Sequence, residues 1–165
     1  MSLEVWVGLG SNLGDRQANL KFAVHHLGEF GSIGRLSDIY ETEPWGLKDQ
    51  PTFLNAVVSV YPETPDPLSF YLRLCDIELE AGRRLTQRWG PRVLDLDLLF
   101  WGVTRIETEQ IVIPHPQVAE RRFVLLPLAQ VAPDLIHPVL GCTISELLRR
   151  CPDTGEVKSW GTFSP

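Results

Sequence analysis

Two aspartates separated by a single residue, Asp95 and Asp97, give the strongest chemical signal in this sequence. Leu94, Leu96 and Leu98 alternate with them, which predicts a strand with both carboxylates on one face, about 6.6 Å apart along the backbone. Carboxylate oxygens suit Mg²⁺, and a bound Mg²⁺ in turn collects phosphate groups. The pair therefore indicates a magnesium and phosphate site, with an ordinary solvent-facing strand as the alternative.

A run of arginines just before this pair strengthens the case for phosphate. Residues 81–94 contain no acid, and their basic members are Arg83, Arg84, Arg88 and Arg92. Guanidinium groups bind phosphate oxygens through a planar fork, and the indole of Trp89 can cover a flat ligand. Taken alone, such a run is as often a solvated loop with weak surface ion pairs. In a chain of net charge −6, and directly before two aspartates, phosphate binding is favoured.

His115 lies between Pro114 and Pro116, so its backbone is restricted on both sides. Its imidazole can donate to a phosphate oxygen or bind a metal, and the alternative is a histidine that caps a turn. Arg121 and Phe123 follow closely in the chain and add a cation and an aromatic ring. This segment is therefore a second candidate contributor to the site.

A flat polar ligand is indicated by an aromatic loop at residues 40–46 and by Phe53 and Asn55, which share one face of a predicted strand. The ring can stack on such a ligand, and the amide can both donate and accept hydrogen bonds. Ordinary core packing is the alternative for Phe53. The phosphate-cradling loops of common nucleotide folds are absent, so we interpret the glycines of residues 8–14 as a tight turn from strand to helix.

The elements that must position these residues follow from hydrophobic periodicity. Strands are predicted at residues 5–9, 33–40, 53–61 and 93–101, and helices at about 16–27, 67–81 and 144–150. The buried stripe predicted for the middle helix is Leu68, Tyr71, Leu72, Cys75 and Leu79. The order of elements indicates an α+β fold, with a mainly antiparallel sheet and helices packed on its face. Residues 152–165 lack periodicity and predict a loose tail.

Length and composition exclude several classes of protein. A chain of 165 residues fits one domain, residues 1–165. No run approaches the ~18 consecutive apolar residues of a membrane span, and the N-terminal residues lack the basic region of a signal peptide. The cysteines form no CxxC pair, which disfavours a disulfide framework and structural zinc. We expect a cytoplasmic monomer that acts on small molecules and binds neither nucleic acid nor membrane.

In combination, the motifs resemble the family of 6-hydroxymethyl-7,8-dihydropterin pyrophosphokinases of folate biosynthesis. The most specific block is Arg-Trp-Gly-Pro-Arg-Val-Leu-Asp-Leu-Asp at residues 88–97. The other blocks occur in order at residues 10–12, 40–46, 53–55, 77–83, 114–116, 122–128 and 132–133. The resemblance covers about residues 4–150. It implies a ferredoxin-like α+β fold and an ATP-dependent transfer of diphosphate to the pterin's hydroxymethyl group, which releases AMP.

The resemblance also implies roles for individual residues. Asp95 and Asp97 would hold two Mg²⁺ ions, and the catalytic set would be Arg83, Arg92, Asp95 and Asp97. The residues expected around ATP are Glu78, Arg88, Trp89, Arg92, His115 and Arg121. The residues expected around the pterin are Thr42, Pro44, Trp45, Phe53, Asn55, Asp95 and Phe123. Gln110 stands where some members of the family have an arginine.

Two other functions compete with this interpretation. A metal-dependent phosphohydrolase built on Asp95, Asp97 and His115 would release phosphate or pyrophosphate without needing a pterin. A nucleotide- or RNA-binding module would use the basic loop and the exposed aromatics, but the net charge of −6 counts against it. Neither alternative accounts for the ordered set of blocks.

Overall fold

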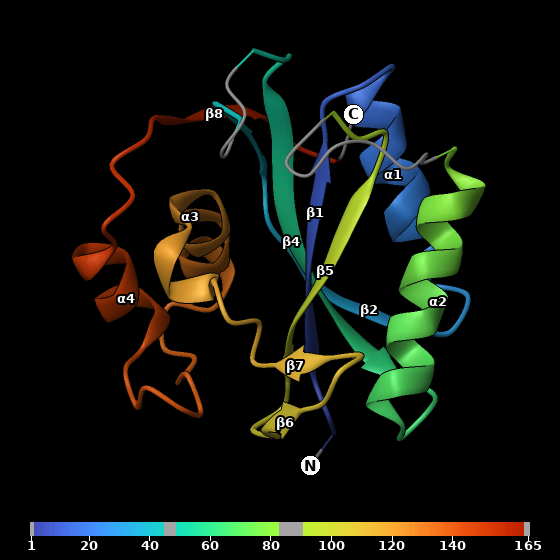
Figure 1. Ribbon diagram of the computed structural model, residues 1–165, viewed down its shortest axis with the longest axis vertical. Helices are drawn as coiled ribbons and strands as arrows, with labels where there is room; N and C mark the ends of the chain where they lie inside the picture. The colour runs from blue at the N-terminus through green and yellow to red at the C-terminus, as the bar shows by residue number, and fades with distance from the viewer. Residues whose placement is uncertain (1, 45–48, 83–90, 164–165) are drawn as a thin grey trace.

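The computed structural model describes residues 2–44, 49–82 and 91–163. The strands are β1 (Val5–Ser11), β2 (Gly31–Leu36), β3 (Ile39–Thr42), β4 (Phe53–Pro62), β5 (Asp95–Trp101), β6 (Ile106–Glu107), β7 (Val112–Ile113) and β8 (Val157–Gly161). The helices are α1 (Arg16–Leu27), α2 (Pro67–Glu80), α3 (Arg122–Val131), α4 (Ile144–Arg150) and the 3-10 turn η1 (Val118–Glu120). Figure 1 shows their arrangement.

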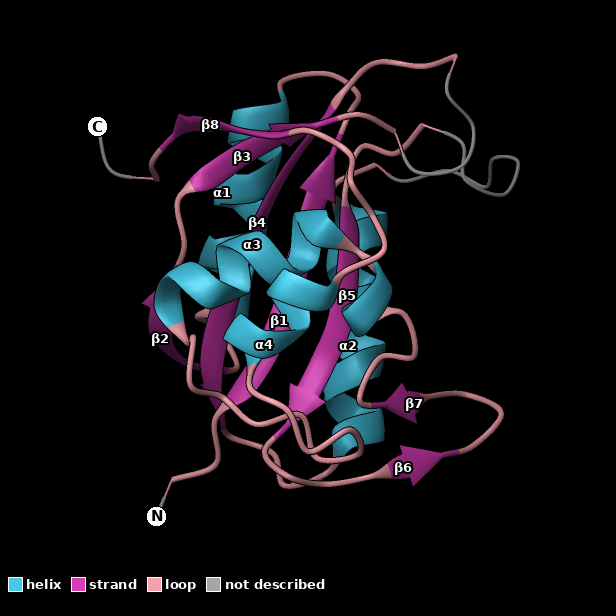
Figure 2. Cartoon of the chain, turned by 90° about the vertical axis from the view of Figure 1, so that its left-hand side faces the viewer, coloured by secondary structure: helices cyan, strands magenta, loops and turns pink. Residues whose placement is uncertain are grey.

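The main sheet has the strand order β5-β1-β4-β3-β8, and β2 also pairs with β4. Every pairing is antiparallel, including that of the separate β6–β7 hairpin. Helices α1 and α2 lie on one side of the sheet, and α3 and α4 lie on the other (Figures 1 and 2). The predicted α+β class with a mainly antiparallel sheet is therefore confirmed, with helices on both faces rather than one.

The alternation of side chains along β1 explains the two layers. Val5, Val7 and Leu9 point into a core that includes residues of α1 and α2, whereas Trp6 packs into a second core with α3 and α4. Beyond Trp6 on this second face, the same positions of β1 are occupied by Gly8 and Gly10. Because glycine has no side chain, the second core stops there and leaves the sheet face open.

The structure corrects the predicted buried stripe of α2. Leu72 and Leu79 are 53% and 65% exposed, while Phe70, Leu74 and Ile77 are the buried apolar residues of the helix. Both sets have helical spacing, so periodicity alone does not choose between them. The choice is made by contacts distant in sequence, such as Phe70 against Trp101, whose ring centroids lie 5.4 Å apart.

Other elements differ from the sequence-based expectation. The predicted strand 33–40 is observed as two strands, β2 and β3, which both pair antiparallel with β4, and the register against β4 shifts between Ile33 and Leu36. Between the two strands Ser37 also bonds to β4, because its Oγ accepts a hydrogen bond from Val57 N at 2.9 Å. Helix α3 contains Pro127, a residue that opposes helix formation locally, and sequence analysis did not predict this helix. In place of a loose tail, residues 157–161 form β8 beside β3.

Residues near the helix ends provide local caps. Asp66 caps α2 by accepting from Leu68 N, with Pro67 in the first turn, and Thr143 and Glu146 form the capping box that begins α4. None of the helices in the described ranges is long and apolar enough to cross a membrane. None of the three cysteines, all within the described residues, forms a disulfide bond.

His137 is a buried histidine far from the aspartate pair, in the loop between α3 and α4. Its Nδ1 accepts hydrogen bonds from Val139 N at 3.2 Å and from Leu140 N at 3.1 Å. These contacts use the neutral imidazole as an acceptor, and burial lowers the pKa of His137 below its ordinary value. These contacts indicate a structural role for His137.

We expect His137 to make the free energy of unfolding fall as the pH decreases below about 6.5, the ordinary histidine pKa. The unfolded chain then binds a proton that the folded chain resists, so protonation favours unfolding. His137→Asn keeps an acceptor and cannot titrate. Denaturant unfolding from pH 7.5 to 5 should show a shallower loss for this variant than for the wild type or for His25→Asn on the surface of α1. Equal slopes would contradict the assignment.

Candidate active site

A cavity of about 320 Å³ opens on the sheet face that Gly8 and Gly10 leave uncovered. A Cβ atom added at Gly10 would lie only 3.1 Å from Asn55 Oδ1 and 3.6 Å from Phe53 Cδ1. Gly8 was predicted inside the strand at residues 5–9, as observed, but the interpretation of Gly10 as part of the turn is wrong, because β1 extends to Ser11. Both glycines line the cavity and form what is here called its floor. The turn that follows contains Gly14, with a φ of 71°.

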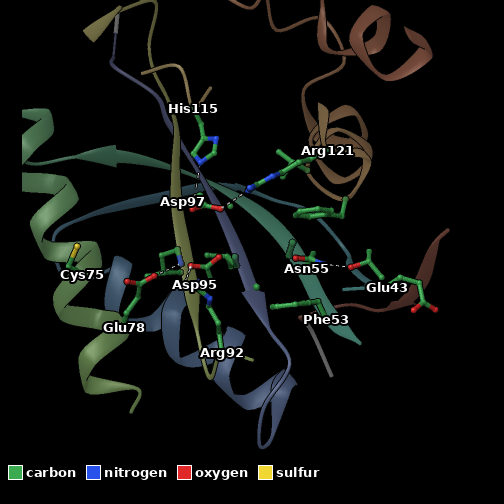
Figure 3. Close-up of a pocket in the computed structure, with 18 of the residues that line it drawn as sticks. Glu43, Phe53, Asn55, Cys75, Glu78, Arg92, Asp95, Asp97, His115 and Arg121 are labelled. Carbon is green, nitrogen blue, oxygen red and sulfur yellow. Dashed lines mark hydrogen bonds and ion pairs between the residues drawn. The ribbon is translucent and has the colours of Figure 1, made fainter. Parts of the chain in front are cut away.

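Asp95 and Asp97 lie next to this floor on β5. In the register of the antiparallel pair, Gly10 is opposite Asp95 and Gly8 is opposite Asp97. Both aspartates line the cavity and point to the same side of the strand (Figure 3). The predicted shared face is confirmed, and the glycines opposite leave space between the two carboxylates and the neighbouring strand.

Glu78 of α2 supports the backbone between the two aspartates. Strand β5 is at the edge of the sheet, and on its outer side Leu96 N donates a hydrogen bond to Glu78 Oε2 at 2.8 Å. The carboxylate is buried, with the residue 8% exposed, and it also lines the cavity. Sequence analysis placed Glu78 near ATP through the resemblance, and the structure shows that its carboxylate also binds the edge of β5.

Two arginines flank the aspartates. Arg92 Nη1 lies 3.7 Å from Asp95 Oδ1, and Arg121 Nη1 lies 3.8 Å from Asp97 Oδ2. Arg92 is held by Asn12, whose Oδ1 accepts from Arg92 N at 2.7 Å and whose own N donates to Arg92 O at 3.0 Å. Sequence analysis gave Asn12 no role, although it lies in one of the quoted motifs. Its contacts show that it fixes the end of β1 to the segment before β5.

His115 lies on the same side as Asp97. Its Nε2 is 3.9 Å from Asp97 Oδ1, and its Nδ1 accepts from Gln117 N at 3.2 Å. Burial, and then the positive charge of Arg121, lower the pKa of His115 to about 4, while Asp95 opposes the shift. The imidazole is therefore neutral near pH 7. Because Nδ1 is an acceptor, we infer that the proton resides on Nε2, which is the atom facing Asp97.

The opposite side of the cavity presents rings and an amide. Phe53 and Asn55 of β4, Thr42 of β3 and Phe123 of α3 all line it. Asn55 Nδ2 donates to Thr42 Oγ1 at 2.6 Å, and both residues are buried. This hydrogen bond fixes the orientation of the amide. This side of the cavity thus has two walls, one formed by Phe123 of α3 and the other by the residues of β3 and β4. Together they combine aromatic surface with a rigid polar edge, as expected for a flat polar ligand.

The cavity brings together most of the predicted site residues, from Thr42, Phe53, Asn55 and Glu78 to Arg92, Asp95, Asp97, His115, Arg121 and Phe123. Pro44 is buried directly after the lining residue Glu43 and is not itself a lining residue. The predictions for Trp45, Arg83, Arg88 and Trp89 lie outside the described residues. Tyr71 and Cys75 of α2 also line the cavity, whereas sequence analysis assigned them to a buried stripe.

A second cavity of about 270 Å³ adjoins the first. It extends towards β7 and is lined by Gln110, Val112 and Pro116, among others. Asp97 and His115 line both cavities, so they stand at the junction between them. No motif in the sequence indicates this second cavity, because the short β6–β7 hairpin that borders it has no strong hydrophobic periodicity.

The side chains around the two aspartates fit Mg²⁺, but they do not fit a metal whose ligands all come from the protein. Within the described residues no group of three His, Cys, Asp or Glu side chains is placed to hold an ion. Mg²⁺ is commonly bound by one or two carboxylates together with water and substrate phosphates. Asp95 and Asp97, with their side chains 32% and 28% exposed, match that arrangement.

Comparisons with known proteins show similarity over most of the chain. A 2-amino-4-hydroxy-6-hydroxymethyldihydropteridine pyrophosphokinase from Methylorubrum extorquens is 44% identical over 155 residues, which are 91% of this chain and 94% of that protein. The enzyme of the same name from Bacillus subtilis is 43% identical over 76% of each chain. The crystal structure of Plasmodium falciparum HPPK-DHPS with pteroate superposes with a TM-score of 0.73 at 18% identity. It matches 91% of this chain, which spans only 44% of the Plasmodium one.

The superposition places the chain among proteins with a ferredoxin-like α+β fold. Residues 6–133 match the family described as 7,8-dihydro-6-hydroxymethylpterin-pyrophosphokinase (HPPK). The chain belongs to this family, and the resemblance stated from the motifs is confirmed.

Proposed function

We propose that this chain transfers diphosphate from ATP to the hydroxymethyl group of 6-hydroxymethyl-7,8-dihydropterin and releases AMP, a step of folate biosynthesis. Membership of the family supports the reaction. The observation that carries it in the structure is the position of Asp97 and His115 between two adjoining cavities. One cavity offers rings and an amide for a pterin, and the other offers space for a nucleotide beside the same charged groups.

The residues divide between the two substrates according to the walls they form. We assign the pterin to Phe53, Phe123, Asn55 and Thr42, with Pro44 and Trp45 in the adjoining loop. We assign ATP to Glu78, Arg92, His115, Arg121, Arg88 and Trp89, and we place its base and ribose in the second cavity. Arg83 completes the catalytic set with Arg92, Asp95 and Asp97, and Asp95 also faces the pterin.

We further propose that Asp95 and Asp97 hold two Mg²⁺ ions together with the phosphates of ATP. When bound, Mg²⁺ would neutralise phosphate charge and orient the transferred group. Arg92 and Arg121 add positive charge beside the same carboxylates. The neutral His115 offers a hydrogen-bond donor at Nε2. The site is thus built to balance the charge of a polyphosphate.

The chemistry requires alignment more than a dedicated base. The hydroxymethyl oxygen of the pterin attacks the β-phosphorus and gives up its proton to solvent, and the bond from that phosphorus to the oxygen bridging the α-phosphorus breaks, so that AMP leaves. The walls hold the hydroxyl and the phosphates together, and the cations stabilise the charge that develops. We therefore assign no general base. We also propose that residues 1–165 act as one domain, as a cytoplasmic monomer that binds neither nucleic acid nor membrane.

An assay of nucleotide products tests the reaction. With Mg²⁺ and ATP, AMP should appear only when 6-hydroxymethyl-7,8-dihydropterin is present, and removing the metal with EDTA should abolish the product. Excess Mg²⁺ should restore it, which controls for damage by the chelator. ADP or free phosphate appearing without the pterin would instead support the phosphohydrolase alternative and contradict the proposed transfer.

A further inference from the structure

The C-terminal segment, residues 151–163, contacts both walls of the cavity to which we assign the pterin. It lies beyond the residues that match the family, which end at residue 133. We propose that this segment, here called the C-terminal brace, positions the pterin-binding walls and thereby sets the affinity for the pterin. The proposal rests on the proposed function, because it presumes that the cavity holds a pterin.

The first contact of the C-terminal brace is at the start of α3. The residue before this helix, Arg121, provides no side-chain cap. Asp153 supplies one from the brace, because its Oδ2 accepts a hydrogen bond from Arg122 N at 3.1 Å. Its Oδ1 accepts from Gly155 N at 2.8 Å, which fixes the carboxylate. A negative side chain at a helix N-terminus is favourable both as a hydrogen-bond acceptor and through the helix dipole.

This cap lies between two residues of the site. Arg122 is flanked in sequence by Arg121, which faces Asp97, and by Phe123, which lines the cavity. The guanidinium of Arg121 is also 5.7 Å from the ring of Phe123. Fixing the backbone at Arg122 therefore also fixes the backbone positions from which the side chains of Arg121 and Phe123 extend. A shift of the helix start would move the ring and the cation together.

The second contact is with β3, on the other wall. Strand β8 of the brace pairs with β3 in a register that places Val157 opposite Thr42 and Lys158 opposite Glu41. On its other side β3 pairs with β4, where Thr42 is opposite Phe53. The short strand that carries Thr42 is thus held from both sides. The Thr42 hydroxyl in turn orients the amide of Asn55 through the 2.6 Å hydrogen bond.

The far end of the brace is anchored in the core. Phe163 packs against the buried cluster that includes residues of α1. Figure 1 shows the red trace leaving α4, passing α3 and reaching β8 beside β3. One continuous segment therefore links the helix that carries Phe123 to the strand that carries Thr42. The brace therefore adds to the direct contacts of α3 with β3, in which Gln130 Oε1 accepts from Tyr40 OH at 2.9 Å, and so helps to set the spacing between the two walls.

Asp153→Ala and Asp153→Asn test the first contact. The alanine variant loses the acceptor and should raise the KM for the pterin about fivefold to tenfold, as expected for the loss of a helix cap. Its KM for ATP should rise less than its KM for the pterin, because Arg121 is the residue assigned to ATP that borders the cap, and the second cavity is lined by residues outside the brace. The asparagine variant retains a capping oxygen and should stay close to the wild type. Glu156→Gln, an exposed change in the same segment, is the matched control.

A double substitution, Lys158→Pro and Ser159→Pro, tests the second contact. Proline removes backbone hydrogen-bond donors from β8 and so weakens its pairing with β3. The KM for the pterin should again rise, while the KM for ATP should stay unchanged. Equal losses in kcat with both KM values unchanged would show a purely structural role and overturn the proposal. So would variants that match the wild type. If the wild type itself formed no pterin-dependent AMP, the proposed function would be contradicted. This outcome differs from one in which the wild type is active and only the proposal for the brace is contradicted.

Discussion

Replacing Asp97 by alanine should lower kcat by about a thousandfold, a loss typical of removing a group that stabilises charge in a transition state. Asp97 stands where the two cavities meet, with His115 Nε2 at 3.9 Å and Arg121 Nη1 at 3.8 Å. Without this carboxylate, the site loses one of the two acids proposed to hold Mg²⁺. The positive charge of Arg121 is then no longer balanced by Asp97. Initial rates of pterin-dependent AMP formation across a range of Mg²⁺ concentrations provide the measurement.

The control for this substitution is His25→Ala. His25 is an exposed residue of α1 and belongs to neither cavity, so its replacement should leave kcat within about twofold of the wild type. Circular dichroism should show that both variants are folded. Similar losses from the two substitutions would discredit the assignment of Asp97 to the site.

Replacing Gly10 by valine should raise the KM for the pterin about tenfold to a hundredfold, because overpacking commonly costs ~1–3 kcal/mol. The added Cβ would lie 3.1 Å from Asn55 Oδ1 and 3.6 Å from Phe53 Cδ1. The Asn55 amide cannot withdraw without stretching its hydrogen bond to Thr42. The branched side chain would therefore fill the floor of the cavity. Calorimetric titration with the pterin measures the loss of affinity directly.

Gly161→Val is the matched control, because a Cβ added at Gly161 meets no atom within 4 Å. It introduces the same side chain into another strand of the same sheet and should leave pterin affinity within about twofold of the wild type. The Gly10 variant should keep its KM for ATP, since Gly10 does not line the second cavity. An unchanged pterin affinity in Gly10→Val would show that the ligand does not rest on this floor.

The sequence by itself determined the features that depend on covalent spacing. Side chains two residues apart on a strand share a face, so the placement of Asp95 and Asp97 side by side needed no knowledge of the fold. The caps of α2 and α4 were predictable for the same reason, because Asp66 and Thr143 act on backbone groups within a few residues. The motifs around these positions were also sufficient to identify the family.

Only the tertiary structure decided which distant residues meet. Gly10 becomes part of the site because antiparallel pairing places it between Asn55 and Asp95, and no local rule fixes that register. The stripe of α2 that faces the core depends on partners such as Trp101. Helix α3 forms despite Pro127, and β8 forms in a segment without periodicity. Burial against the sheet and pairing with β3 stabilise these elements, and such contacts between residues far apart in the chain leave no periodic pattern in the sequence.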